Sequence, residues 1–212
     1  MSRKELLRLV SGFRRFREKY FEAENSPYRK LAHSQNPKTL VIGCSDSRVD
    51  PAIITSAGPG DLFVVRNVAN LVPPYETSGG LHGVSAAIEF AVVNLKVEHV
   101  IVLGHRQCGG IRALVTGLQG DSDSFVDRWV SIARPAHFRA LAANPQAGAD
   151  ELCQHCELEA IKISLENLRT FPFVREAEKE RGMALIGAYF DLESGRLLEL
   201  DPVSGNFINL NV

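Results

Sequence analysis

The stretch Thr39–Arg48, with the sequence TLVIGCSDSR, joins a buried strand to a group of reactive side chains. Residues 39–43 are mostly apolar and include β-branched types, which is typical of a strand that is covered on both faces. A thiol, a carboxylate and a guanidinium follow at once, from Cys44, Asp46 and Arg48. In an open α/β sheet, ligands bind at the carboxyl ends of the strands. The stretch therefore predicts both a parallel sheet and the edge at which its site lies.

A second stretch of this kind, residues 99–104 with the sequence HVIVLG, is followed by His105 and Cys108. With Cys44 they provide two sulfur donors and one nitrogen donor at the ends of two strands. Such a set suits zinc, and three protein ligands leave a fourth position for water. Each residue alone is better explained as a small core cysteine or a satisfied core histidine. Their conjunction at two strand ends favours the metal.

Asp46 and Arg48 have separate expected roles beside this metal. Zinc with two thiolates is formally neutral, so its water needs help to ionise near pH 7. A carboxylate that accepts a hydrogen bond from that water would orient it. Arg48 can hold Asp46 in a bidentate grip and keep it from binding the metal itself. Without Cys44 beside them, an ordinary salt bridge at a strand end would be the better explanation.

The rest of the chain alternates apolar strands with helical patterns, which predicts an α/β fold. We expect a mostly parallel four-stranded central sheet, extended by C-terminal strand structure and flanked by helices. The expected strands are residues 39–43, 62–66, 99–104, 184–190, 196–200 and 206–210. The expected helices are residues 3–22, a segment opening at Ser78-Gly79-Gly80, and residues 124–143, 151–169 and 172–182. One domain is expected over 1–212, with an N-terminal helical arm at 1–34 and a zinc-binding core at 35–212.

The composition excludes several classes of protein. The 212 residues include 45% hydrophobic types and carry a formal net charge of −1, so no global field favours nucleic acid or an anionic membrane. Four cysteines are too few for a disulfide scaffold. The N-terminus lacks the apolar core of a signal peptide, so a cytoplasmic location is expected, with an organelle stroma as the alternative. The amphipathic helix at 3–22 is expected to pack on the body or on a second subunit, in preference to a membrane surface or a role as a transit peptide.

The two metal-binding stretches resemble the zinc motifs of the β-class carbonic anhydrase family, and the likeness is closest to its plant-type branch. It covers about residues 30–202 and includes the sequences RNVANLVPP at 66–74, AAIEF at 86–90 and FP at 171–172. The resemblance implies reversible hydration of CO2 to bicarbonate and a proton by zinc-bound hydroxide, with one Zn2+ per subunit. It also implies a homodimer that can assemble into a tetramer or a larger oligomer.

The resemblance assigns roles at matching positions. The zinc ligands would be Cys44, His105 and Cys108, and Asp46 with Arg48 would form the catalytic pair. The substrate cleft would be lined by five further residues: Gln35, Phe63, Val68, Phe90 and the backbone of Gly109. Gln35, Phe63 and Phe90 would reach the site across the dimer interface. From the sequence alone, plain core packing would explain the two phenylalanines.

Some members of the family close their zinc with the aspartate and bind a regulatory bicarbonate nearby. That subgroup carries a tryptophan and a tyrosine where this chain has Val41 and Phe190, so we expect a site that is open at pH 8. Arg106, next to a predicted ligand, is expected to point to solvent or to another subunit; the alternative is that its charge lowers the pKa of zinc-bound water. Cys153 and Cys156 are expected to be packing residues, and the alternative is a second metal or redox site. His82 is a speculative proton shuttle.

Two alternatives to CO2 hydration remain at this stage. A hydrolase of carbonyl sulfide or carbon disulfide would use the same zinc ligands with a different cleft. A non-catalytic, zinc-stabilised subunit would need a fourth protein ligand that closes the site. The presence of Asp46 and Arg48 beside the ligands makes this alternative less favoured.

Overall fold

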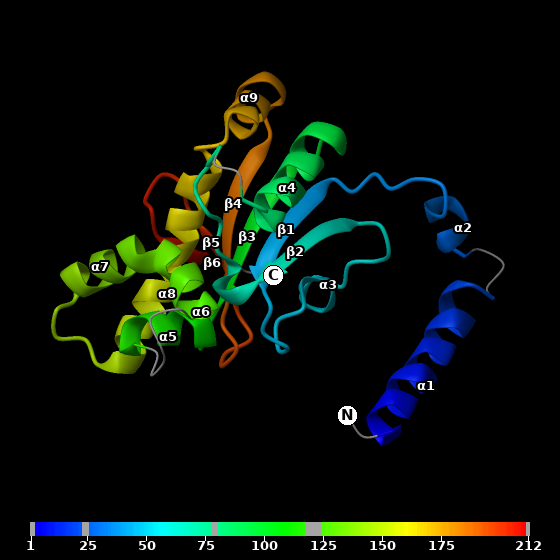
Figure 1. Ribbon diagram of the computed structural model, residues 1–212, viewed down its shortest axis with the longest axis horizontal. Helices are drawn as coiled ribbons and strands as arrows, with labels where there is room; N and C mark the ends of the chain where they lie inside the picture. Colours follow the sequence, from blue (N-terminus) through cyan, green and yellow to red (C-terminus); the bar gives the residue numbers. More distant parts are fainter. Residues whose placement is uncertain (1–2, 23–25, 78–79, 118–123, 211–212) are drawn as a thin grey trace.

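A computed structural model describes residues 3–22, 26–77, 80–117 and 124–210, and Figure 1 shows its α/β architecture. One sheet has the strand order β2-β1-β3-β4-β5-β6. The first four of these pair in parallel and the last two pair antiparallel, as the sequence predicts. The strands are β1 (Thr39–Cys44), β2 (Leu62–Asn67), β3 (His99–His105), β4 (Ala184–Phe190), β5 (Leu197–Leu200) and β6 (Phe207–Asn209).

Helices pack against this sheet and supply most of the core. The longest of them, α8 (Ala149–Leu168), contacts both β3 and β4. One large apolar cluster joins Leu40 and Ile42 of β1 to Val102 of β3 and Ile161 of α8. The other helices of the core are α3 (Pro51–Ile54), α4 (Gly83–Glu89), α5 (Gly109–Thr116), α6 (Phe125–Val130), α7 (Arg134–Ala143) and α9 (Pro172–Arg181), with short turns η1 (Val68–Asn70), η2 (Phe90–Asn94) and η3 (Ser131–Ala133).

Two of the predicted helices differ in the structure, which also has α3 and α5 where no helix was predicted. Residues 124–143 form α6, the 3-10 turn η3 and α7 in place of one helix, and Pro135 lies in the first turn of α7. Proline has no N–H to donate and suits the start of a helix, which explains the break. The helix expected from Ser78 begins at Gly83, and Ser78 and Gly79 lie outside the described residues.

The N-terminal arm consists of α1 (Arg3–Tyr20) and α2 (Tyr28–Leu31). No residue of either helix is buried, and Figure 1 shows α1 standing clear of the sheet and its helices. Leu9 and Phe13 are among its exposed apolar side chains. The prediction that the arm packs on the body of its own chain is therefore wrong, because its apolar stripe meets no core surface there. None of the helices in the described part of the chain is long and apolar enough to span a bilayer.

The topology brings the two metal-binding stretches together. Strands β1 and β3 are parallel neighbours, and Gly43 lies opposite Leu103 in their register. Cys44 and His105 therefore end adjacent strands at the same edge of the sheet.

Candidate metal centre

Three potential ligands meet at this edge: Cys44 at the end of β1, His105 at the end of β3 and Cys108 just before α5. One ligand atom from each lies within 4.8 Å of the other two, and all three residues are buried. The donor set of two sulfurs and one nitrogen is the one predicted from the sequence. It matches the three-ligand type of zinc site that keeps an open position.

The imidazole of His105 is oriented for a metal. Its Nδ1 lies 2.8 Å from the carbonyl oxygen of Arg106. A carbonyl can only accept, so Nδ1 carries the hydrogen and Nε2 keeps a free lone pair. Nε2 is buried and has no hydrogen-bond partner among the described residues. Buried polar atoms are seldom left unpaired, so a metal ion between this nitrogen and the two sulfurs fits the site.

The two thiols interact with each other. A hydrogen bond from Cys108 is the main cause that lowers the pKa of Cys44, and the same pairing raises the pKa of Cys108. A metal ion binds cysteine as the thiolate, so its binding would release protons from this pair and its affinity would depend on pH.

Asp46 and Arg48 form the expected pair at the rim of this centre. Arg48 Nε donates to Asp46 Oδ1 at 2.9 Å, and Nη2 donates to Oδ2 at 2.7 Å. This grip holds the pKa of the Asp46 carboxyl well below its usual range. Oδ2 lies 4.0 Å from Nε2 of His105, so the carboxylate faces the centre while it stays bound to the guanidinium.

Arg66 also serves the site, and the sequence reasoning gave it no role. Its guanidinium donates to the carbonyl oxygens of Cys44, at 2.8 Å, and Asp46, at 2.6 Å, and to the carboxylate of Asp50 at 3.0 Å. It thereby fixes the loop that carries both the ligand and the carboxylate. The available sequence signal was an arginine that directly follows the apolar run of β2; the register that sets it opposite Gly43 is known only from the structure.

Glu157 of α8 is a second residue without a predicted role. It is only 3% exposed, and its Oε1 accepts a hydrogen bond from the backbone N–H of Cys108 at 2.9 Å. Tyr189 donates to its other oxygen at 2.7 Å. A glutamate within the buried face of a helix was the available sequence signal, because such residues are rarely buried without a partner.

Two of the five predicted cleft residues lie beside the metal-binding loop. Gly109 directly follows Cys108 and begins α5. Val68 lies against the same loop, because a Cβ added at Gly110 would meet Val68 Cγ1 at 2.6 Å.

The other three, Gln35, Phe63 and Phe90, are not brought to the centre of their own chain. Phe63 pairs with Leu40, four residues before the end of β1, which corresponds to about 13 Å along the strand. The Phe63 and Phe90 rings stack on each other with centroids 5.8 Å apart. Gln35 is exposed and precedes β1, toward the opposite edge of the sheet.

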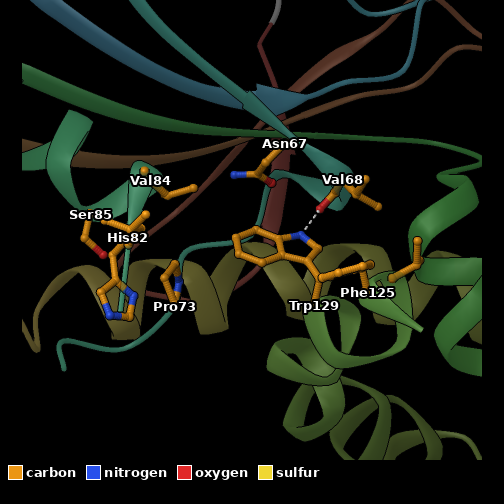
Figure 2. A pocket seen from close by; sticks show the side chains of 11 residues that line it. Asn67, Val68, Pro73, His82, Val84, Ser85, Phe125 and Trp129 are labelled. Atoms are coloured by element: carbon orange, nitrogen blue, oxygen red, sulfur yellow. Dashed lines mark hydrogen bonds between the residues drawn. The ribbon is translucent and has the colours of Figure 1, made fainter. Parts of the chain in front are cut away.

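An apolar hollow of about 530 Å³ begins at Val68 and is shown in Figure 2. Trp129 forms part of its wall and donates from Nε1 to the carbonyl oxygen of Val68 at 2.7 Å. His82, the speculative proton shuttle, also lines the hollow. The hollow thus adjoins the metal-binding loop through Val68 and through Asn67, whose carbonyl accepts a hydrogen bond from the Ser45 N–H at 2.8 Å.

The remaining residues singled out in the sequence lie nearby or in the core. Val41 belongs to a small apolar cluster against which Phe190 packs. The backbone of Arg106 is bonded on both sides, since its N–H donates to the carbonyl of Phe190 at 2.9 Å and its carbonyl holds His105. Cys153 and Cys156 are buried free thiols, and burial raises the pKa of Cys156 to about 12, which favours the packing interpretation.

Comparison with known proteins gives a consistent result. Residues 39–197 match the family model described as carbonic anhydrase. The chain is 39% identical over 199 residues to β carbonic anhydrase 3 of Arabidopsis thaliana, covering 92% of this chain and 77% of the relative.

Solved structures of β-carbonic anhydrases also resemble this one. The enzyme CcaA matches with a TM-score of 0.89 and 34% identity, over 99% of this chain and 93% of the other. CafA of Aspergillus fumigatus matches with a TM-score of 0.82 and 33% identity, over 93% and 91%. A tetrameric β-carbonic anhydrase of Sordaria macrospora matches with a TM-score of 0.74 and 31% identity, over 92% and 93%. The chain therefore belongs to the β class of the carbonic anhydrase family, whose members are zinc enzymes that interconvert carbon dioxide and bicarbonate.

Proposed function

We propose that this protein catalyses the reversible hydration of CO2 at the centre formed by Cys44, His105 and Cys108, with Asp46 and Arg48 as its catalytic pair. One observation carries the proposal: the unpaired, buried Nε2 of His105 lies among two thiols, with the arginine-bound carboxylate of Asp46 4.0 Å away. When bound, zinc supplies the Lewis acidity that makes water a nucleophile near neutral pH.

Asp46 orients the attacking water in this scheme. Its carboxylate is ionised, because Arg48 lowers its pKa, and it can only accept hydrogen bonds. Accepting one from the water turns an oxygen lone pair toward the substrate. Arg48 occupies both carboxylate oxygens from the other side, which keeps the carboxylate out of the fourth ligand position.

The hollow beside Val68 suits the substrate. Carbon dioxide is uncharged and has no dipole, so a wall made of Val68, Trp129 and their apolar neighbours accepts it without loss of hydrogen bonds. The product is an anion, and the backbone N–H of Gly109 and the half-exposed guanidinium of Arg48 offer it donors at the rim.

A second copy of the chain completes the cleft in this proposal. Phe90 is exposed, and it stacks on Phe63 of β2, the edge strand of the sheet. With Gln35, these side chains are placed to serve the site of a neighbouring subunit. The arm would also pack on that subunit, because this would bury the exposed apolar stripe of α1. We accordingly propose a homodimer at least, and the tetrameric relative from Sordaria macrospora makes a larger assembly reasonable.

Light scattering coupled to gel filtration tests this assembly. The full chain should elute with the mass of two or more copies. A variant without residues 1–34 should stay folded, since no residue of α1 or α2 is buried. Its assembly should contain fewer copies of the chain than the parent's, and its activity should be lower. A monomeric, fully active parent would contradict the shared cleft.

Two further expectations belong to the proposal. The apolar contact of Phe190 with the Val41 cluster supports a site that is open at pH 8, because neither side chain offers a polar group to an anion. Anomalous scattering at that pH would refute this if Asp46 occupied the fourth ligand position. Four buried free thiols suit a reducing cytoplasm, which fractionation of the source cells would test.

Stopped-flow measurement of CO2 hydration by the zinc-loaded protein tests the reaction itself. We expect turnover of CO2 well above that of carbonyl sulfide or carbon disulfide under the same conditions. Faster hydrolysis of carbonyl sulfide or carbon disulfide would identify the protein as a hydrolase of that substrate. No turnover of any of the three substrates would indicate that the zinc has a structural role only.

A further inference from the structure

The peptide unit between Gln107 and Cys108 is held at both ends. Its carbonyl oxygen accepts a hydrogen bond from Arg48 Nη2 at 3.1 Å. Its N–H, which belongs to Cys108, donates to Glu157 Oε1 at 2.9 Å. The C=O and N–H of a trans peptide point in opposite directions, so the two partners fix its orientation from opposite sides. One of them is the rim guanidinium that holds Asp46, and the other is a buried carboxylate.

This peptide unit needs such restraint because the backbone before it is strained. Gln107 has a φ of +59°, in the left-handed region that residues other than glycine seldom adopt. The Gln107 side chain is also held in place, because its Nε2 donates a hydrogen bond to Glu193 Oε1 at 2.6 Å. A change of the Gln107 φ to the usual negative range would reorient the peptide unit that follows it and would break its bonds to both Arg48 and Glu157. These two bonds therefore oppose the relaxation of the loop.

Glu157 is itself firmly anchored. It lies on α8 and is 3% exposed, and Tyr189 of β4, which donates to its second oxygen, is 2% exposed. The carboxylate thus links the metal-binding loop to a helix and a strand in the core. Most of the other buried side chains of this helix are apolar, including Ala160 and Ile161, so packing alone would favour an apolar residue at position 157.

We propose that Glu157 is a positioning residue for the metal centre: it holds the Cys108 N–H and, together with Arg48, fixes the Gln107–Cys108 peptide unit so that the Cys108 sulfur points at zinc. The same peptide unit connects the catalytic pair to the ligand, since Arg48 binds Asp46 and the Gln107 carbonyl at once. Residues that orient a metal ligand in this way contribute to metal affinity alongside the ligand itself. The proposal rests on the zinc assignment made above.

The test compares Glu157 with Glu159, a neighbour on the same helix whose carboxylate pairs with Lys162 at 2.6 Å and does not touch the loop. We would prepare Glu157→Gln, Glu157→Leu and the control Glu159→Leu, and measure zinc affinity by competition with a chelator. Glutamine keeps an acceptor for the Cys108 N–H, so Glu157→Gln should bind zinc nearly as tightly as the parent. Glu157→Leu should lose about 10–100-fold in affinity, and Glu159→Leu should lose none.

A second readout separates positioning from general stability. The visible spectrum of the cobalt-substituted protein reports the geometry of the thiolate ligands. Its bands should shift in Glu157→Leu and keep their positions in Glu157→Gln and in the control. Unchanged affinity and spectrum in Glu157→Leu, or equal losses in the control, would overturn the proposal. Failure of the parent to bind zinc would instead count against the metal centre itself.

Two more variants keep the proposal open to refutation if Glu157→Leu does not fold. Tyr189→Phe leaves the carboxylate with the Cys108 N–H alone and should lower zinc affinity in the same direction but to a smaller extent. Gln107→Gly removes the left-handed strain, so it should reduce the loss caused by Tyr189→Phe when the two are combined. If Tyr189→Phe leaves affinity unchanged, or if Gln107→Gly makes the loss larger, Glu157 does not act through this peptide unit.

Discussion

Arg48 and Asp46 are joined by two parallel hydrogen bonds, Nε to Oδ1 at 2.9 Å and Nη2 to Oδ2 at 2.7 Å. Only one residue, Ser45, separates Asp46 from Cys44, and the carboxylate still faces the metal centre across 4.0 Å. The guanidinium thus donates to both oxygens of the carboxylate, and we expect this grip to keep Asp46 from binding zinc itself.

Asp46→Asn should keep zinc and lose most of its turnover. The amide is nearly isosteric and leaves the three ligands in place, but it accepts hydrogen bonds more weakly than the ionised carboxylate. We expect kcat to fall by about 10²–10⁴-fold, the range for a lost general-base contribution. Stopped-flow CO2 hydration together with zinc content per subunit checks this. Parent-like turnover, or zinc lost in parallel with activity, would show that Asp46 has another role.

Arg48→Lys should lower activity by about tenfold or more while zinc stays bound, because lysine keeps the positive charge but not the planar two-bond grip. Loss of that grip raises the pKa of Asp46 from its lowered position toward its usual value near 3.8. The carboxyl remains ionised at pH 7–9 even so. The deficit should therefore be constant across that range in a pH profile of kcat. A deficit that disappears at pH 9 would mean that charge, and not position, was lost.

Gly104→Ala should destabilise the protein by about 1–3 kcal/mol, the usual cost of forcing an extra methyl group into a packed core. The new Cβ would lie 2.7 Å from Ile161 Cδ1, too close for van der Waals contact. Adding Ile161→Val removes that methyl group and should restore part of the loss. Urea unfolding of both single variants and the double variant measures the coupling. Simple additivity of the two single losses would contradict the predicted clash.

Glu166→Gln tests an ion pair between α7 and α8 and its pH dependence. Arg139 donates to both oxygens of Glu166, at 2.7 and 2.9 Å, and lowers the pKa of that carboxyl below its usual value near 4.5. Both side chains are about half exposed, so we expect the variant to lose only about 0.5 kcal/mol at pH 7.

The sign of the pH effect follows from the lowered pKa of Glu166. The stabilisation is complete above the unfolded value near 4.5 and is lost as pH falls through the lower folded value. The difference in free energy of unfolding between parent and variant, measured with urea, should therefore be constant from pH 8 to 6 and become smaller below pH 4.5. A difference that grows toward low pH would contradict a stabilising ion pair between Arg139 and Glu166.

The sequence predicts the sheet and the zinc ligands well because both depend on local patterns. The apolar runs before Cys44 and His105 are unambiguous strands, and parallel pairing then forces their ends together. The break between α6 and α7 was missed because apolar periodicity continues through Pro135, although proline marks the start of a helix.

The roles of Arg66 and Glu157 could not be predicted in the same way. Each acts on backbone groups that are distant in the sequence: Arg66 holds the carbonyl of Cys44, and Glu157 holds the N–H of Cys108. Such contacts depend on how strands and α8 pack, which periodicity does not specify. The surface on which the arm packs was left open, between its own chain and a second subunit, for a related reason: the amphipathic pattern of α1 identifies an apolar stripe but not what covers it.

Catalysis by the zinc centre is tested most directly by measuring CO2 hydration while zinc is removed and restored in the parent and in Cys108→Ala. We expect the parent to lose activity in proportion to the zinc extracted by a chelator and to regain it when zinc is added back. Cys108→Ala, which lacks one of the three ligands, should bind little zinc and stay inactive at equal zinc supply. Full activity in the zinc-free parent, or in Cys108→Ala, would contradict the assignment of the Cys44, His105 and Cys108 centre as the site of catalysis.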